Sequence, residues 1–456
     1  MTDDTALQFK GPEFLTRADS PVHRIRCPIH GFIHFSENER KVIDHWLFQR
    51  LRLIRQLALT EYVYPGATHT RFEHSFGAME VATRFFDAIN LRRGEIIEDK
   101  IKDLPEFHEK PLDKARQVVR LAALLHDIGH ICFSHASEHV LLKGGNHETL
   151  TVDILKEKDL LGTLIDDTFW PGCSELVAKV LDKGEPSIPQ IRFLRDIISG
   201  EMDADRTDYL IRDSHHCGVD YGRFDFRRLI ECVDVVEEEG GLELALREDG
   251  IHTFEALIMA RFQINTQIIC HRLRRLYDIY LREYFSALGD DAPQTRDDLL
   301  KTNDIEMLAR IVKDADSANE NVSRWAKRIK ERRHHKTIFD TGVGADAMDL
   351  SRIRKLKERL ESQYDRVDFL LDDRSGATIH NLWKPGERQE RDRIVMKMVM
   401  SDQETKTVNE ESIVFRNIPH NFDCYRVYAD PGPEKQALLS ELRKSSRLIW
   451  NELRGR

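Results

Sequence analysis

The sequence lacks the features that mark secreted, disulfide-bonded or membrane-spanning proteins. No apolar run approaches the roughly 18 residues that a membrane span requires, and the N-terminus, Met1-Thr-Asp-Asp-Thr, is acidic and has no signal-peptide pattern. The 7 cysteines are odd in number, scattered, and form no C-x-x-C pair. These absences argue against a disulfide framework and against a zinc ribbon. We therefore expect a chain that works in a reducing cytoplasm and has no membrane partner.

An excess of positive charge is also missing. Lys and Arg number 69 against 79 Asp and Glu, which gives a formal net charge of −10. This balance disfavours a protein that coats nucleic acid, although it leaves room for a locally basic pocket around an anionic ligand. Internal repeats and low-complexity tracts are absent as well. At 456 residues the chain is long enough for one large domain and a smaller lobe.

Helical periodicity fills most of the first 290 residues. Ser36 and Glu39 form a capping-box pattern that opens a helix, and apolar residues continue at helical spacing as far as Leu57. The segment 26–35, which contains Pro and Gly, and the Gly240-Gly241 pair interrupt this periodicity. Each of these two interruptions predicts a short hairpin.

The character of the sequence changes beyond a long predicted helix over 253–286. The chain becomes strongly charged, and strand-like segments near 393–400 and 424–429 precede a predicted helix over 433–453. The predicted fold class is mainly α with a smaller C-terminal α+β lobe. The predicted organisation has three parts: a flexible N-terminus over 1–20, a helical domain over 21–290 with the candidate chemistry, and an α+β lobe over 291–456.

The candidate chemistry centres on Leu121-Ala-Ala-Leu-Leu-His-Asp-Ile-Gly-His130, in which an apolar run ends in the pair His126–Asp127. Imidazole and carboxylate groups together suit many divalent metals. The alternative is a buried helix that the two polar residues merely cap. Because burying both groups without partners would be costly, the metal site is the favoured interpretation.

A second polar segment lies over 203–213, where four aspartates interleave with two arginines. Asp205, Tyr209 and Asp213 are spaced so that they line one face of a helix. A solvent-exposed stripe of paired charges would give the same pattern. The tyrosine among the carboxylates, and the Gly-containing turn that follows, favour a functional site.

With His74, these segments supply a set of nitrogen and oxygen ligands in helical or helix-end positions: His74, His126, Asp127 and Asp205. Such a set suits Mn, Fe, Zn, Mg, Co or Ni, and it leaves positions open for water and a phosphate oxygen. The ligands are far apart in the sequence, so a tertiary fold has to bring them together.

The order H…HD…D on a helical scaffold resembles the HD-domain metal-dependent phosphohydrolases. Further segments narrow the resemblance to the deoxynucleoside triphosphate (dNTP) triphosphohydrolases, a branch that includes bacterial dGTPases and the animal enzyme with an added sterile-alpha-motif domain. The similar segments lie within about residues 20–285: Phe48-Gln-Arg-Leu-Arg-Leu-Ile-Arg-Gln-Leu57, Tyr62-Val-Tyr-Pro-Gly66, Arg71-Phe-Glu-His74, His126-Asp-Ile-Gly-His130, Phe133-Ser-His135, and Asp203-Ala-Asp-Arg-Thr-Asp-Tyr209 with Arg212-Asp213.

The resemblance implies a role for each matching position. Metal ligands are implied at His74, His126, Asp127 and Asp205, and catalytic roles at His135, His147 and Glu138. Contacts to the triphosphate are implied for Arg71, His130, Arg206, Tyr209 and Arg261. Contacts to the deoxyribose are implied for Gln56, Leu57 and Asp213.

Two positions depart from the branch. Glu138 stands where an aspartate is common, and its extra methylene lengthens the reach to a histidine. Ile269 stands where the animal enzyme packs a tyrosine under the sugar to exclude a 2′-hydroxyl. An isoleucine could still exclude that group by its bulk, so the sequence leaves the preference for deoxyribose over ribose open.

The implied reaction is hydrolysis of a dNTP to a deoxynucleoside and tripolyphosphate. A metal lowers the pKa of bound water, arginines grip phosphate, and a histidine can move a proton. The same metal site would also serve a phosphodiesterase or phosphatase that acts on another nucleotide. A third interpretation is a non-catalytic nucleotide sensor, which would predict lost ligands. Preferred base, native metal, activator and biological setting do not follow from the sequence.

A basic cluster, Arg324-Trp-Ala-Lys-Arg-Ile-Lys-Glu-Arg-Arg-His-His-Lys336, lies in the predicted lobe. Such a run is most often a solvated face. With Trp325 it could instead bind a regulatory nucleotide or single-stranded nucleic acid. The resemblance implies a tetramer or hexamer with an allosteric nucleotide site between subunits.

Overall fold

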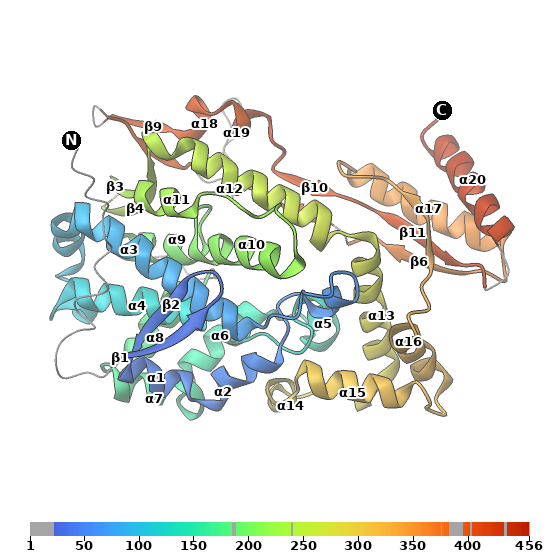
Figure 1. Cartoon of the computed structure of the whole chain (residues 1–456), viewed down its shortest axis with the longest axis horizontal. Coiled ribbons are helices and arrows are strands. Elements are labelled where there is room, and N and C mark those ends of the chain that lie inside the picture. The colour runs from blue at the N-terminus through green and yellow to red at the C-terminus, as the bar shows by residue number, and fades with distance from the viewer. Residues whose placement is uncertain are drawn as a thin grey trace.

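The computed structural model describes residues 22–184, 188–238, 240–374, 376–382, 395–401, 404–432 and 436–455. The predicted flexible segment 1–20 lies outside these ranges. Over the described residues the chain is mainly helical with small sheets, which confirms the predicted fold class (Figure 1). In these same ranges, no helix combines the length and apolarity needed to cross a membrane.

A two-stranded hairpin and a bundle of helices form the first part of the chain. The hairpin predicted over 26–35 is present as β1 (Val22–Cys27) and β2 (Gly31–Ser36). The helices are α1 (Glu37–Ile43), α2 (Trp46–Gln49), α3 (Arg71–Ile101), α4 (Pro111–Leu125), α5 (His135–Leu141), α6 (His147–Lys156), α7 (Thr163–Thr168), α8 (Cys173–Leu181), α9 (Arg192–Ser199), α10 (Ala204–Cys217), α11 (Phe226–Cys232) and α12 (Ile251–Ile264).

The middle of the bundle is the pair α3 and α4, which pack side by side. The apolar run at the end of α4, from Leu121 to Leu125, has no exposed surface. α10 packs on α3, so the ends of α3, α4 and α10 meet. This arrangement brings the predicted ligand segments together.

Two predicted helices are interrupted, and at the first interruption a long-range hydrogen bond is present. The helix expected to reach Leu57 ends at Ile43, and after α2 the backbone becomes extended at Ile54. There the Ile54 carbonyl accepts a hydrogen bond from the Arg71 backbone amide at 3.0 Å. Inside a continuous helix, that carbonyl would instead accept from the residue four positions later. The helix predicted over 253–286 is broken by a π-helical turn at Asn265–Ile269, and α13 begins after this turn.

Beyond α10, the described residues form three further small sheets. The hairpin predicted at Gly240–Gly241 is β3 with β4, and it joins two later strands in the order β3-β4-β8-β9. A second sheet has the order β5-β11-β6, and β10 pairs with β7. The strands are β3 (Val233–Glu238), β4 (Gly241–Arg247), β5 (Lys336–Asp340), β6 (Asp368–Asp372), β7 (Gly376–Thr378), β8 (Lys397–Val399), β9 (Thr405–Thr407), β10 (Asn421–Asp423) and β11 (Arg426–Asp430).

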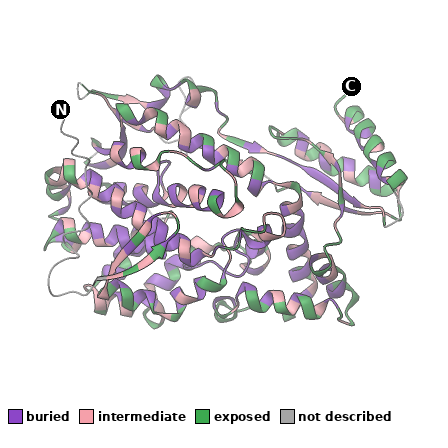
Figure 2. Cartoon of the chain, viewed as in Figure 1, coloured by how far each residue is buried: buried purple, intermediate pink, exposed green. Residues whose placement is uncertain are grey.

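The remaining helices divide between two hydrophobic cores. The main core extends past residue 290 and includes side chains of α14, α15 and α16, whereas a second core lies between the β5-β11-β6 sheet, α17 and α20. The outward faces of α20 are exposed (Figure 2). These helices are α13 (Arg272–Leu288), α14 (Arg296–Lys301), α15 (Asp304–Asp314), α16 (Glu320–Lys330), α17 (Ala347–Gln363), α18 (Val408–Glu411), α19 (Ile413–Asn417) and α20 (Gln436–Leu453).

A buried ion pair joins the start of the chain to the central helix. The predicted capping box of α1 is present, since Ser36 and Glu39 each accept a backbone hydrogen bond from the other. Glu39 also pairs with Arg120 of α4 at 2.6 Å, and neither side chain is more than 2% exposed. Removing one member of such a pair leaves the other charge buried without a partner.

We expect Glu39→Ala to lower the free energy of unfolding by about 3–5 kcal/mol, because Arg120 loses its counter-charge in a dry environment. Glu37→Ala is the matched control: Glu37 lies on the same helix but on the surface, where it pairs with His23, and should change stability little. Urea denaturation followed by circular dichroism measures both. Equal denaturation midpoints for the two variants would contradict the stabilising role of the buried Glu39–Arg120 pair.

Candidate metal and catalytic site

The four predicted metal ligands meet where three helices end. His74 lies in the first turn of α3, His126 and Asp127 follow the last residue of α4, and Asp205 lies in the first turn of α10. His74 Nε2 is 3.0 Å from Asp205 Oδ1 and 3.2 Å from His126 Nε2. His126 Nε2 is 3.4 Å from Asp127 Oδ1. These spacings suit neighbouring ligands of one metal ion.

Hydrogen bonds on the far side of each ring direct both Nε2 atoms toward that point. His126 Nδ1 donates to the Ala123 carbonyl at 2.8 Å, and His74 Nδ1 donates to Asp208 at 2.8 Å. Each ring therefore keeps an Nε2 lone pair for a metal. The donor set fits a divalent cation. Burial lowers the pKa of His74, but Asp205 and Asp208 together raise it to about 10, so these carboxylates favour a positive charge at Nε2, either a proton or a metal cation in its place.

Asp208 is a buried residue that sequence reasoning did not single out. Its carboxylate contacts three cationic or imidazole groups: His74, His30 at 2.6 Å, and Arg212 at 2.8 Å. A Cβ on Gly77 would lie 2.0 Å from Asp208 Oδ1, so the glycine allows α10 to approach α3. In the sequence, the spacing of three residues between Asp205 and Asp208 indicated that both lie near one face of a helix, but it assigned no role to Asp208.

Arg71, expected at the triphosphate, lies against a metal ligand. Its Nη1 pairs with Asp127 Oδ2 and its Nε donates to Ser134 Oγ at 2.8 Å. Burial would raise the pKa of Asp127, but Arg71 and nearby histidines hold it well below its usual range. The Asp127 carboxylate is therefore ionised and available to a cation.

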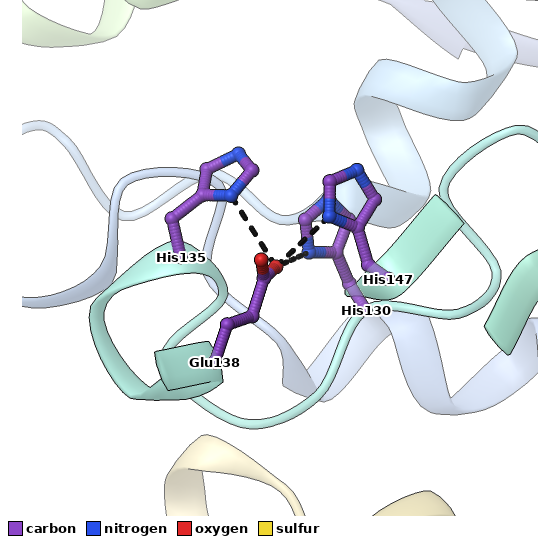
Figure 3. A group of neighbouring side chains, drawn as sticks. All are labelled: His130, His135, Glu138 and His147. Atoms are coloured by element: carbon purple, nitrogen blue, oxygen red, sulfur yellow. Dashed lines mark ion pairs between the residues drawn. The ribbon is translucent and has the colours of Figure 1, made fainter. Parts of the chain in front are cut away.

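The predicted catalytic residues form a second cluster (Figure 3). Glu138 Oε1 is 3.0 Å from His147 Nδ1, 3.2 Å from His130 Nδ1 and 3.3 Å from His135 Nδ1. Burial would raise the pKa of Glu138, but the three histidines lower it far below its usual range. His135 is the exposed member, with 63% of its side chain accessible, and the others are mostly buried. The glutamate thus reaches the histidines despite replacing an aspartate.

The composition of this second cluster would also suit a metal, but the ring geometry disfavours it. The rings of His130 and His147 are stacked with centroids 3.7 Å apart and planes within 14°. A ligand lone pair lies in the ring plane, so two stacked rings cannot both point at one ion. The cluster is better suited to holding and moving protons. Within the described residues, the better metal site is the group of His74, His126 and Asp127, with Asp205 Oδ1 3.0 Å from His74 Nε2.

Three residues predicted to contact phosphate lie on α10 and α12. Arg206 pairs with Asp203 at 2.6 Å, and burial raises the pKa of Tyr209 to about 12, which keeps its hydroxyl protonated. Arg261 is 8% exposed, and within the described part of the chain its Nε and Nη1 make no hydrogen bond. Its nearest carboxylate is Glu201, at 3.7 Å. A buried guanidinium with free donors is suited to an anion.

The predicted sugar contacts are linked through one histidine. His69 Nε2 is 2.8 Å from Asp213 Oδ1, while its carbonyl accepts the Gln56 amide at 3.1 Å. Gln56 Oε1 is buried and, in the described ranges, has no hydrogen-bond partner. Leu57 is also buried. The other position of interest, Ile269, lies at the end of the π-helical turn that follows α12.

Comparison with known protein families matches two parts of the chain. Residues 71–213 match the HD domain, and residues 224–366 match the HD associated region. An uncharacterised protein of Methanocaldococcus jannaschii is 33% identical over 285 residues, or 62% of this chain and 54% of that protein. The human deoxynucleoside triphosphate triphosphohydrolase SAMHD1 is 26% identical over 304 residues, or 58% of this chain and 44% of that protein. The chain thus spans about half the length of these relatives.

Solved structures share the fold over nearly the whole chain. A hypothetical protein from Aquifex aeolicus matches with a TM-score of 0.72 and 26% identity, covering 93% of this chain and 100% of that one. A phosphohydrolase from Bacteroides thetaiotaomicron matches with a TM-score of 0.67 and 20% identity, covering 90% of this chain and 100% of that one, and shows the fold alone.

All four predicted ligands lie within the matched HD segment. Their side chains form a cluster that fits the divalent metal on which HD domains depend. The chain therefore contains an HD domain over residues 71–213 and an HD associated region over residues 224–366, and its relatives are consistent with an HD-domain, dNTP triphosphohydrolase-like branch.

Proposed function

We propose that this chain is a metal-dependent dNTP triphosphohydrolase, which converts a dNTP and water to a deoxynucleoside and tripolyphosphate. The observation that carries the proposal is the adjacency of two clusters. The ligand group of His74, His126, Asp127 and Asp205 adjoins the proton-holding group of His135, Glu138 and His147. His130 lies between them, 3.3 Å from Asp127 and 3.2 Å from Glu138.

The reaction breaks the bond between the α-phosphorus and the 5′ oxygen. Water adds to the phosphorus, and the departing 5′ oxygen takes up a proton. A bound metal would activate that water and neutralise a phosphate oxygen. His135, exposed and in contact with ionised Glu138, is the proposed proton donor, and its contribution is on the order of 10²–10⁴-fold.

Substrate binding is assigned to groups around these clusters. Arg206, Tyr209 and Arg261 would hold the triphosphate, because guanidinium groups bind phosphate oxygens in pairs and a protonated phenol donates. Gln56 and Asp213 offer acceptors for a sugar hydroxyl. In this proposal Arg71 and His130 act partly through Asp127, which both contact.

The named relative supports the substrate class without fixing it. The human protein that carries the dNTP triphosphohydrolase name is 26% identical, and the chain covers 44% of its length. A phosphodiesterase or phosphatase could use the same ligands, so product analysis has to separate the reactions. A non-catalytic sensor is disfavoured because all four ligands are present.

A regulatory nucleotide bound between subunits of a tetramer or hexamer remains part of the proposal. The basic cluster lines a cavity of about 730 Å³ with Arg324, Lys327, Arg328, Arg333 and Lys336. That concentration of cations supports an anionic ligand. Trp325, by contrast, is 9% exposed and packs near Tyr280. Because its ring faces the interior, it offers little for stacking single-stranded nucleic acid.

Incubation of the protein with each dNTP and NTP, with Mn²⁺ or Mg²⁺, should give deoxynucleoside and tripolyphosphate from at least one dNTP. Anion-exchange chromatography separates tripolyphosphate from pyrophosphate and orthophosphate. Release of the two smaller anions, or turnover of none of these nucleotides, would overturn the proposed reaction. Comparing dATP with ATP tests whether Ile269 excludes a 2′-hydroxyl.

Asp205→Ala should abolish metal-dependent turnover, with a loss of at least about 10³-fold, because the metal loses a carboxylate ligand and the activated water with it. Asp220→Ala is the matched control, since Asp220 lies just beyond α10 on the surface. Metal content by mass spectrometry should fall in the first variant and not in the second. Full activity in Asp205→Ala would refute the ligand set.

Asp208→Asn should weaken metal binding on the order of 10–100-fold, because the amide cannot hold the His74 ring through a charged hydrogen bond. Titration of the metal-free protein with Mn²⁺, followed by calorimetry, measures the change, and Asp220→Asn serves as the control. Unchanged affinity would show that His74 needs no support from Asp208.

A further inference from the structure

The loop that leads into α5 has an unusual backbone. Phe133 and Ser134 both have positive φ angles, 58° and 50°, although neither is glycine. L-residues rarely adopt this region, and such a strained conformation persists only where its surroundings hold it in place. His135 follows directly. The direction of the exposed histidine in the proton-holding cluster therefore depends on what secures this loop.

One carboxylate from another part of the chain secures it. Asp304 Oδ1 accepts the Phe133 amide at 2.6 Å, and Asp304 Oδ2 accepts the Arg55 amide at 2.9 Å. Asp304 is the first residue of α15 and is 1% exposed. It lies beyond the predicted boundary at residue 290, where sequence reasoning found no chemistry.

The two amides belong to segments that both adjoin the site. Arg55 precedes Gln56, and its carbonyl accepts Ser134 Oγ at 3.0 Å. Ser134 Oγ in turn accepts Arg71 Nε, and Arg71 pairs with the metal ligand Asp127. Asp304 therefore holds together the loop before His135 and the extended segment before Gln56.

The chemistry of this position requires two acceptors. A carboxylate offers one oxygen to each amide, whereas a side-chain amide has one acceptor oxygen and a donating NH₂ group. Asparagine would accept a hydrogen bond from one backbone N–H, but it would place its own NH₂ group, which is a donor, against the other backbone N–H. A buried backbone N–H without an acceptor is destabilising, because it has lost its contact with water and gained no partner.

We propose that Asp304 is a positioning residue that fixes the strained loop before His135 and, through Arg55, the segment that carries Gln56. The HD associated region thereby contributes to the geometry of a site whose ligands all lie in the HD domain. In the described part of the chain, the Asp304 side chain bonds the Phe133 and Arg55 amides, and it makes no hydrogen bond or ion pair with the candidate metal ligands or with the proton-holding cluster. The kinetic test of this role rests on the proposed function, whereas the structural test does not.

The test compares Asp304→Asn with Asp297→Asn, an exposed aspartate in α14 that pairs with Lys301. Hydrogen–deuterium exchange should become faster in peptides covering 54–57 and 131–136 in the first variant and stay unchanged in the second. Unchanged exchange in Asp304→Asn would overturn the proposal. This readout needs no substrate, so it decides the matter even if the protein hydrolyses no dNTP.

With a substrate in hand, Asp304→Asn should lower kcat on the order of 10–100-fold because His135 is misplaced, whereas KM should rise by a smaller factor because the Gln56 sugar contact is displaced and the phosphate contacts are intact. Metal content should equal that of the wild type. Asp304→Glu, which keeps two acceptor oxygens, should recover part of kcat. Equal losses in kcat and in metal content, or no recovery with glutamate, would indicate a general structural role and overturn the positioning one.

Discussion

The candidate metal site depends on the hydrogen bond between His74 and Asp208. It fixes which nitrogen of His74 faces the other ligands, and it joins α3 to α10 at the point where both must contribute. Asp208 is itself held by His30 and Arg212, and none of the three side chains is exposed. Because the loss of one member of a buried ionic group costs about 3–5 kcal/mol, the orientation of the ligand is tied to the stability of the helix pair. Gly77 allows this contact, since a side chain there would overlap the carboxylate.

From this anchored ligand the site extends through His130. Burial and the nearby Arg71 lower the pKa of His130 to about 3, so its ring is neutral at physiological pH. A neutral imidazole has one N–H, yet carboxylates lie 3.3 Å from Nε2 and 3.2 Å from Nδ1. The ring can donate to Asp127 or to Glu138, but not to both at once. His130 thus lies between the candidate metal ligands and the proton-holding cluster, within 3.3 Å of a carboxylate oxygen of each group.

Patterns among neighbouring residues predict the features that depend only on interactions between neighbouring residues. The capping box at Ser36, the shared helix face of Asp205 and Tyr209, and the two hairpins are properties of neighbouring residues, and the structure contains them. The break at Ile54 depends on a hydrogen bond to Arg71, which periodicity cannot register. The role of Asp208 depends on packing between α3 and α10. Asp304 lies 171 positions from the amide that it binds, and the run of charge around it resembled a solvated surface.

Through Asp304, the region beyond residue 290 contacts two segments that adjoin the candidate site. The hydrophobic core does not divide near residue 290: Leu299, Met307 and Ile311 belong to the same buried cluster as the apolar run of α4. α15 packs against α16, whose basic residues line the cavity of about 730 Å³. Since Asp304 begins α15, a displacement of that helix would act on the Phe133 and Arg55 amides together. Two left-handed residues give the loop little freedom to absorb the movement. His135 and Gln56 would therefore move together, which makes α15 one physical connection between the helix that lines the basic cavity and the candidate active site.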